Sequence, residues 1–74
     1  MNLAFNLIQY ASLLAEAIPK IIHTKEEYDR ALHVIELLHF KSNPTPEEDA
    51  LYDLLLMLIK TYENKTYPKS TPKN

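Results

Sequence analysis

One stretch of this sequence has a spacing that could hold a metal ion. His33, Glu36 and His39 recur every three residues, and on a helix that turns ~100° per residue they span about 120° of one flank. Imidazole and carboxylate groups bind zinc, and di-metal carboxylate bundles take Glu-x-x-His from two helices. This sequence has one such motif and no second. We therefore interpret the three side chains as solvated surface residues and expect no cofactor.

The other residues that could do chemistry have simpler explanations. Neighbouring carboxylates occur at positions 26–27 and 47–49, both in first helical turns, where the helix dipole favours acidic groups. The sequence contains no cysteine for a thiolate nucleophile and no glycine for a phosphate-binding loop. The serines have no partner pattern that would mark a nucleophile. We expect that the protein is not an enzyme.

The first helix is predicted from about Asn2, as its N-cap, to Ala17. Apolar residues recur at helical spacing along it, and Pro19 ends it because the residue before a proline avoids the α region. The connector at Pro19–His23 follows, with a short helical turn as one option. Its two isoleucines are expected to fold back onto the core.

The second helix is predicted to begin after Thr24, with Glu27 three residues later to complete a capping box. It ends before the polar loop at positions 41–44, which closes with a proline. Its predicted buried face consists of Tyr28, Ala31, Leu32, Ile35 and Leu38.

The third helix is predicted from Pro46 to about Asn64, capped by Thr45 with Glu48 as the second half of a capping box. Apolar residues surround most of this helix, and such a helix is normally buried. Three helices in a chain of this size cannot enclose it on every side, so part of its surface is a candidate interface with a partner or a second copy. The candidate interface residues are Tyr52, Leu56, Met57, Ile59 and Tyr67.

Together these patterns predict an all-α fold, a small three-helix domain completed by dimerisation. The helical interaction domain spans residues 1–64, and residues 65–74 form a flexible polar tail. Tyrosines are enriched at interfaces because they bury area and keep a polar end. We expect Tyr28 and Tyr62 to border the core instead.

The charge of the chain is unevenly distributed. The first 64 residues hold five basic and ten acidic side chains, whereas the last ten hold three lysines and no acid. An acidic body suits a basic protein partner and does not suit nucleic acid, whose affinity comes from Lys and Arg. The longest apolar run, Leu54–Ile59, is far short of the ~20 residues of a membrane span. With no cysteine, a reducing cytoplasm fits.

Four segments in order carry a family resemblance. They are Tyr10 with Ile18-Pro19-Lys20-Ile21-Ile22; Thr24-Lys25-Glu26-Glu27-Tyr28-Asp29-Arg30-Ala31-Leu32, continued by Ile35 and Leu38; Thr45-Pro46-Glu47-Glu48 with Leu51, Asp53, Leu54 and Leu55; and Ile59, Tyr62-Glu63 and Tyr67-Pro68. Their order and spacing resemble the N-terminal region of HigA-type antitoxins of bacterial toxin–antitoxin pairs.

The resemblance implies two properties of this region, dimerisation and contact with a toxin, which is a small basic ribosome-dependent ribonuclease of the RelE type. In that family a helix-turn-helix domain follows and binds the operator. The resemblance stops before that domain, so we expect this chain alone not to bind nucleic acid. The expected function is therefore an antitoxin-like interaction domain that dimerises, neutralises such a toxin, or both. The alternative is a structural homo-oligomer with no toxin partner.

Overall fold

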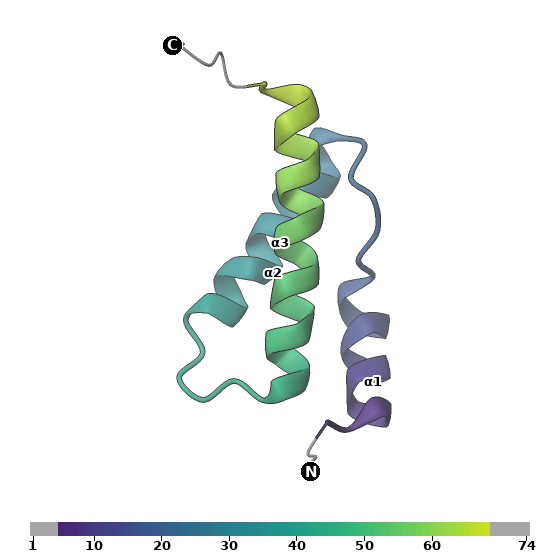
Figure 1. The fold of residues 1–74 in the computed structure, drawn as a ribbon, viewed down its shortest axis with the longest axis vertical. Helices are drawn as coiled ribbons and strands as arrows, with labels where there is room; N and C mark the ends of the chain where they lie inside the picture. The colour runs from purple at the N-terminus through teal and green to yellow at the C-terminus, as the bar shows by residue number, and fades with distance from the viewer. Residues whose placement is uncertain (1–4, 69–74) are drawn as a thin grey trace.

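A computed structural model describes residues 5–68 of the chain, and within this range all the regular structure is helical. Three helices follow one another there: α1 at Leu7–Ala17, α2 at Lys25–His39 and α3 at Pro46–Thr66 (Figure 1). The predicted all-α, three-helix fold is confirmed. α3 is two residues longer than predicted, so the helical part extends past the boundary expected at residue 64.

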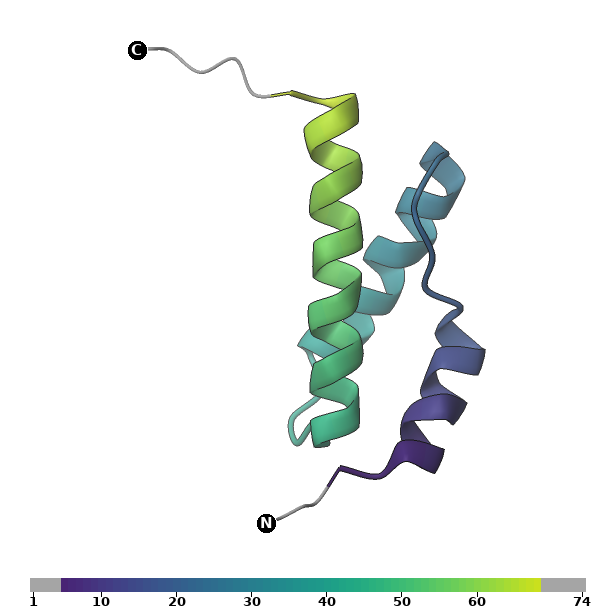
Figure 2. The same cartoon turned by 45° about the vertical axis from the view of Figure 1, so that its right-hand side comes forward.

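α3 is the helix on which the other two pack. It has 21 residues and is therefore about 32 Å long. α1 runs beside the N-terminal half of α3, while α2 crosses α3 obliquely (Figure 2). The main contacts between helices are those of α1 with α3 and of α2 with α3.

The core is small and consists of two groups of buried side chains along α3. Ala17, Leu51 and Leu55 form the first group, between α1 and α3. The second group joins the connector, α2 and α3 through Ile22, Ala31 and Ile59. Half-buried apolar side chains surround both groups: Tyr10, Leu13, Leu14, Tyr28, Val34, Ile35, Leu38, Leu58 and Tyr62. Tyr28 and Tyr62 border the core, as predicted.

The predicted N-cap of α3 is confirmed in both halves. The Thr45 hydroxyl accepts a hydrogen bond from the Glu48 N–H at 3.1 Å, and the Glu48 carboxylate accepts one from the Thr45 N–H at 2.9 Å. At the start of α2, the Thr24 hydroxyl accepts from the Glu27 N–H at 3.1 Å. There the Glu27 carboxylate accepts instead from the N–H of His23, at 2.7 Å. The second capping box is therefore displaced by one residue.

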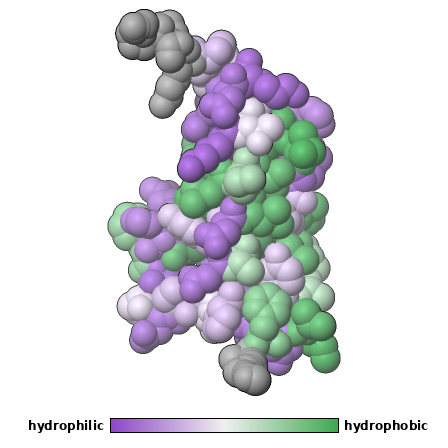
Figure 3. Space-filling view, viewed as in Figure 1, coloured by the Kyte–Doolittle hydropathy of each residue, from purple (hydrophilic) through white to green (hydrophobic). Residues whose placement is uncertain are grey.

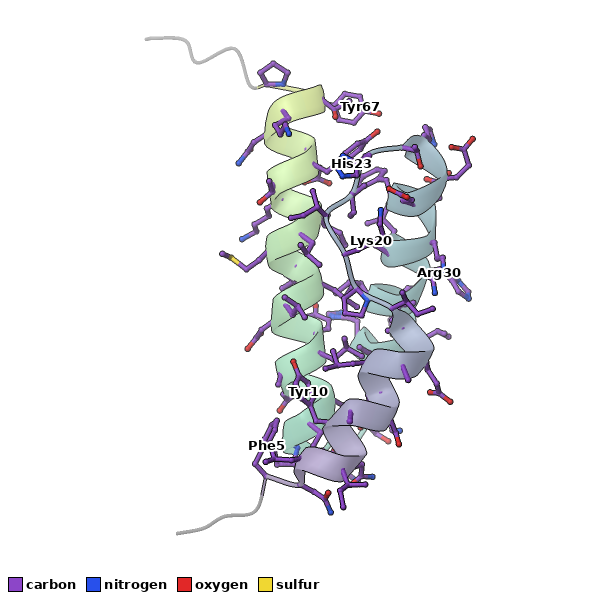
Figure 4. All side chains as sticks on the ribbon, turned by 90° about the vertical axis from the view of Figure 1, so that its right-hand side faces the viewer. Phe5, Tyr10, Lys20, His23, Arg30 and Tyr67 are labelled. Atoms are coloured by element: carbon purple, nitrogen blue, oxygen red, sulfur yellow. The ribbon has the colours of Figure 1, made fainter. Side chains whose placement is uncertain are left out.

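The N-terminus of α1 differs from the prediction. Asn6 is the N-cap, and its side-chain oxygen accepts a hydrogen bond from the Gln9 N–H at 3.0 Å. Asn2, the predicted cap, lies outside the described residues. Asn6 also donates its backbone N–H to the Glu47 carboxylate, which links the start of α1 to the first turn of α3. Phe5 and Tyr10 lie beside this junction (Figure 4), with their ring centroids 5.2 Å apart.

The connector between α1 and α2 contains no helical turn, so that option is wrong. Ile18 is the C-cap of α1. It has φ 46° and ψ 60°, and it is the one residue in the described range with a positive φ. A left-handed conformation is costly for a β-branched residue. Ile22 is buried as predicted, whereas Ile21 is exposed. The extended connector lets Ile22 reach the core without a helical turn.

The predicted buried faces need two corrections. Leu32 lies at the exposed edge of α2, and Val34, on the other side of that face, packs against the first buried group. Ile59 was predicted to offer surface to a partner, but only 4% of it is exposed. That prediction is wrong because α2 and the connector already cover Ile59.

Candidate protein-binding site

A shallow groove of about 560 Å³ lies on the outer side of α2 where this helix meets α3. Ile35 forms part of its floor, and exposed or half-buried side chains line the rest. Its lining residues are Asp29, Leu32, His33, Ile35, Glu36, His39, Phe40 and Tyr52. α2 supplies most of them because positions three and four apart share one face of a helix.

Three aromatic rings form the end of the groove nearest the α2–α3 loop. The Nδ1 of His39 lies 3.2 Å from the Tyr52 hydroxyl, which is hydrogen-bonding distance. The His39 ring lies edge-on to the Phe40 ring, with 5.1 Å between their centroids. Phe40 is 77% exposed, although it is among the most hydrophobic side chains in the protein. This end of the groove therefore offers a partner a large apolar contact.

An ion pair fixes the loop that carries Phe40. Lys41 donates its ammonium to the Glu48 carboxylate at 2.6 Å, and this carboxylate also accepts the Thr45 N–H. The Lys41 ammonium and the Thr45 N–H lower the pKa of Glu48 below its ordinary value of 4.5. Because the carboxylate is nearly buried, the contact anchors Lys41, and with it Phe40, to the first turn of α3.

The groove is acidic. Asp29 and Glu36 are its two carboxylates, and none of its lining residues is a lysine or an arginine. Lys25 pairs with Asp29 at 3.1 Å, but both groups are exposed and four residues apart on one helix, so the attraction is weak. The groove therefore combines an apolar lining with negative charge.

The predicted interface residues do not form one patch. Tyr52 lines the groove, and Leu56 is half-buried one turn further along the same stripe of α3. Met57 is 66% exposed, but it lies about 140° around α3 from Tyr52. Tyr67 caps α3 and lines a separate hollow beside Lys60, Glu63 and Asn64. The structure therefore brings together Tyr52 and Leu56, and leaves Met57, Ile59 and Tyr67 apart from them.

Sequence reasoning missed the contribution of α2 to this site. The helical periodicity does not indicate Phe40, which follows the last residue of the pattern and precedes a polar loop. The sequence nevertheless contains a sign that Phe40 is exposed, since it lies just past the end of the helix and outside the predicted buried face, which ends at Leu38. The periodicity predicts that Leu32 is buried in the core, whereas in the structure it is exposed and lines the groove.

The residues of the metal-like motif also lie along the groove. His33, Glu36 and His39 are all exposed lining residues, which agrees with the expectation that they are surface side chains. Within residues 5–68, no three or more His, Asp or Glu side chains come together closely enough to hold a metal ion. In this groove the motif supplies one carboxylate and two imidazoles, and one of the imidazoles bonds to Tyr52.

Two further carboxylates outside the groove connect α2 to the connector and to α3. Glu27 accepts hydrogen bonds from the Lys20 ammonium and the His23 N–H, both at 2.7 Å, and these contacts lower its pKa to about 2. Lys20 and His23 lie on the connector (Figure 4), so Glu27 ties the connector to α2. Glu63 accepts a hydrogen bond from the Tyr28 hydroxyl, which raises the pKa of Tyr28 to about 12 and ties α2 to α3.

Comparisons with known proteins add no relative. No protein-family model, curated protein or solved structure matches this chain. Within the described range, no helix has both the length and the apolar character needed to cross a bilayer.

Proposed function

We propose that this chain is an antitoxin-like interaction domain that binds and neutralises a small basic ribonuclease toxin of the RelE type. Two independent lines support the proposal. The first is the ordered resemblance of its capped helices to the N-terminal region of HigA-type antitoxins. The second is the chemistry of the groove between α2 and α3.

The observation that carries the proposal is the composition of this groove. Leu32, Phe40 and Tyr52 give it an apolar lining, and Asp29 and Glu36 give it negative charge without a lining cation. A matching ligand presents an apolar side chain to the aromatic end and a lysine or arginine to the carboxylates. A segment of a basic protein has this pattern, whereas an RNA strand brings phosphates that the carboxylates repel.

The charge of the whole body favours the same partner. Ten acidic and five basic side chains in residues 1–64 produce a negative field that accelerates encounters with a basic protein. A ribonuclease contacts RNA phosphates through its own Lys and Arg side chains. If the groove binds some of these cations, they are no longer available to RNA, and this is how the domain would neutralise the toxin.

The first experiment is a pull-down of the tagged chain from its native host, followed by mass spectrometry. We expect a small basic protein at near-stoichiometric yield. Glu36→Lys should reduce that yield by about tenfold or more, because it replaces an attractive charge with a repulsive one in the groove. The matched control is Glu16→Lys, which makes the same charge change on α1 and should retain the partner.

The captured protein is then co-expressed with the chain in a growth assay. The wild-type chain should restore growth, while Phe40→Ala should fail to restore it although the variant stays folded, since Phe40 lies largely outside the core. Continued growth arrest with a soluble wild-type chain contradicts neutralisation. Recovery of the chain alone in the pull-down supports the alternative, a homo-oligomeric protein with no toxin partner.

A further inference from the structure

The end of the groove nearest the α2–α3 loop places an exposed carboxylate one helical turn from an exposed aromatic ring. The carboxylate belongs to Glu36 and the ring to Phe40. The Phe40 N–H donates to the Glu36 carbonyl oxygen at 3.2 Å, so the two residues keep helical spacing. Side chains four residues apart on a helix have their Cβ atoms about 5–6 Å apart. Figure 3 shows hydrophilic and hydrophobic surface side by side at the lower left, where this end of α2 and the loop lie.

The cations of the protein itself are engaged elsewhere. Lys25 pairs with Asp29, the other carboxylate of the groove, and Lys41, which follows Phe40 directly, pairs with Glu48 at 2.6 Å. Within residues 5–68, the Glu36 carboxylate belongs to none of the ion pairs. A cation supplied by a partner therefore meets no competing ion pair at Glu36 in this part of the chain.

An arginine side chain matches this carboxylate and ring better than a lysine does. The guanidinium is planar, so it can lie with its face on an aromatic ring while its N–H groups, which point outward in its plane, donate to a carboxylate. A cation over the face of a ring is attracted by the charge distribution of the ring. The lysine ammonium is a compact and strongly hydrated charge. It can pair with the carboxylate, but it does not stack on the ring at the same time.

We propose that the groove recognises an arginine of its partner, which stacks on Phe40 and donates to the Glu36 carboxylate. This inference rests on the proposed function for the kind of partner, and it adds which basic side chain the groove selects. Leu32 lines the groove one turn before Glu36, so an apolar neighbour of that arginine has a surface on which to pack. The recognised element is therefore an arginine with an apolar residue about one helical turn away.

Titration of the ¹⁵N-labelled chain with two capped tetrapeptides tests the inference. The probes are Leu-Ala-Ala-Arg and Leu-Ala-Ala-Lys, which differ in the cation alone. We expect the arginine peptide to bind about two- to fivefold more tightly, which is the contribution of a stacked cation at an exposed site. The amide shifts should be concentrated in the last turn of α2 and the following loop. A third peptide with citrulline, which has nearly the shape of arginine but no charge, should bind most weakly.

Two variants separate the ring from the carboxylate. Phe40→Leu keeps an apolar side chain but removes the aromatic face, so it should bind the arginine and lysine peptides equally. Glu36→Gln removes the charge and should weaken binding of both. The matched control is Glu16→Gln, which makes the same change on α1 and should retain both the affinity and the preference. Phe40 and Glu36 lie outside the core, so circular dichroism should show an unchanged fold.

Several results overturn the inference: equal affinities of the wild-type chain for the two peptides, a preference for arginine that survives Phe40→Leu, shifts confined to residues outside the groove, or an arginine peptide that does not bind. The peptides take the place of the toxin, so this test is independent of the pull-down. A captured basic ribonuclease without a preference for arginine overturns this inference alone. A preference for arginine without a captured ribonuclease counts against the proposed function alone.

Discussion

Ile18 ends α1 in a left-handed conformation that glycine normally adopts, and replacing it isolates the cost of that conformation. The perturbation is Ile18→Gly, compared with Ile21→Gly. The two isoleucines lie three residues apart in the same connector and have nearly equal exposure, 56% and 52%. Both substitutions remove the same side chain and add the same flexibility to the unfolded chain. They differ in one respect, since Ile21 has an ordinary negative φ.

The difference between the two variants therefore measures the backbone strain at Ile18. A left-handed conformation costs a non-glycine residue roughly 1–2 kcal/mol, and glycine removes this cost at position 18 but not at position 21. We expect Ile21→Gly to lower the free energy of unfolding by about 1–2 kcal/mol more than Ile18→Gly does. In urea, this corresponds to a difference of about 1–2 M between the two unfolding midpoints, for a slope of roughly 1 kcal/mol per M.

The assay is urea unfolding followed by far-UV circular dichroism, with both variants and the wild-type chain measured at one protein concentration. Equal midpoints for the two glycine variants refute the assignment of strain to Ile18. A lower midpoint for Ile18→Gly than for Ile21→Gly also refutes it, because relief of strain at position 18 predicts the opposite order. Ile18→Asn is a further check, since asparagine tolerates this conformation without the flexibility of glycine.

Three other predictions concern the core and the polar contacts. Leu55→Ala should lower the free energy of unfolding by roughly 2–5 kcal/mol in thermal or urea unfolding, whereas Met57→Ala on the exposed side of α3 should change it by less than about 0.5 kcal/mol. Tyr28 has its pKa raised to about 12 in the folded protein, so its contribution to stability is complete below pH 10 and is lost as the pH rises toward 12. Tyr28→Phe should remove this decrease in the free energy of unfolding between pH 10 and pH 12. Glu27 has its pKa lowered to about 2, so its contribution is complete above its ordinary pKa of 4.5 and is lost as the pH falls toward 2; Glu27→Gln should remove that part of the acid dependence in melts recorded from pH 6 to pH 2.

Local signals predicted the helices well. The reciprocal hydrogen bonds of Thr45 and Glu48 depend on two residue types three positions apart, so the sequence carries them in full. The end of α1 near Pro19 is equally local. Asn2 and Asn6 are both good N-caps, however, and the sequence does not distinguish them. The contact that favours Asn6 is with Glu47, 41 residues away.

The candidate site was harder to predict because it depends on how the helices are placed. Periodicity showed that α3 is apolar on most sides, but it did not show which side α2 and the connector cover. Ile59 and Met57 both lie on that helix, yet one is buried and the other is exposed. The groove joins residues of α2 to Tyr52 across the loop, and no spacing within one helix could indicate that contact.

The packing of α1 and α2 on α3 determines which helices can open separately during hydrogen exchange. Because α1 packs mainly against α3, it can detach while α2 and α3 stay paired, and such a partial opening exposes less apolar surface than global unfolding. The amides of α1 should therefore exchange with deuterium faster than those in the middle of α3, whose protection reports the unfolding of the whole domain. A second molecule that covers α1 would slow exchange in α1 and leave α3 nearly unchanged. Exchange rates along the chain thus distinguish a ligand on α1 from one in the groove.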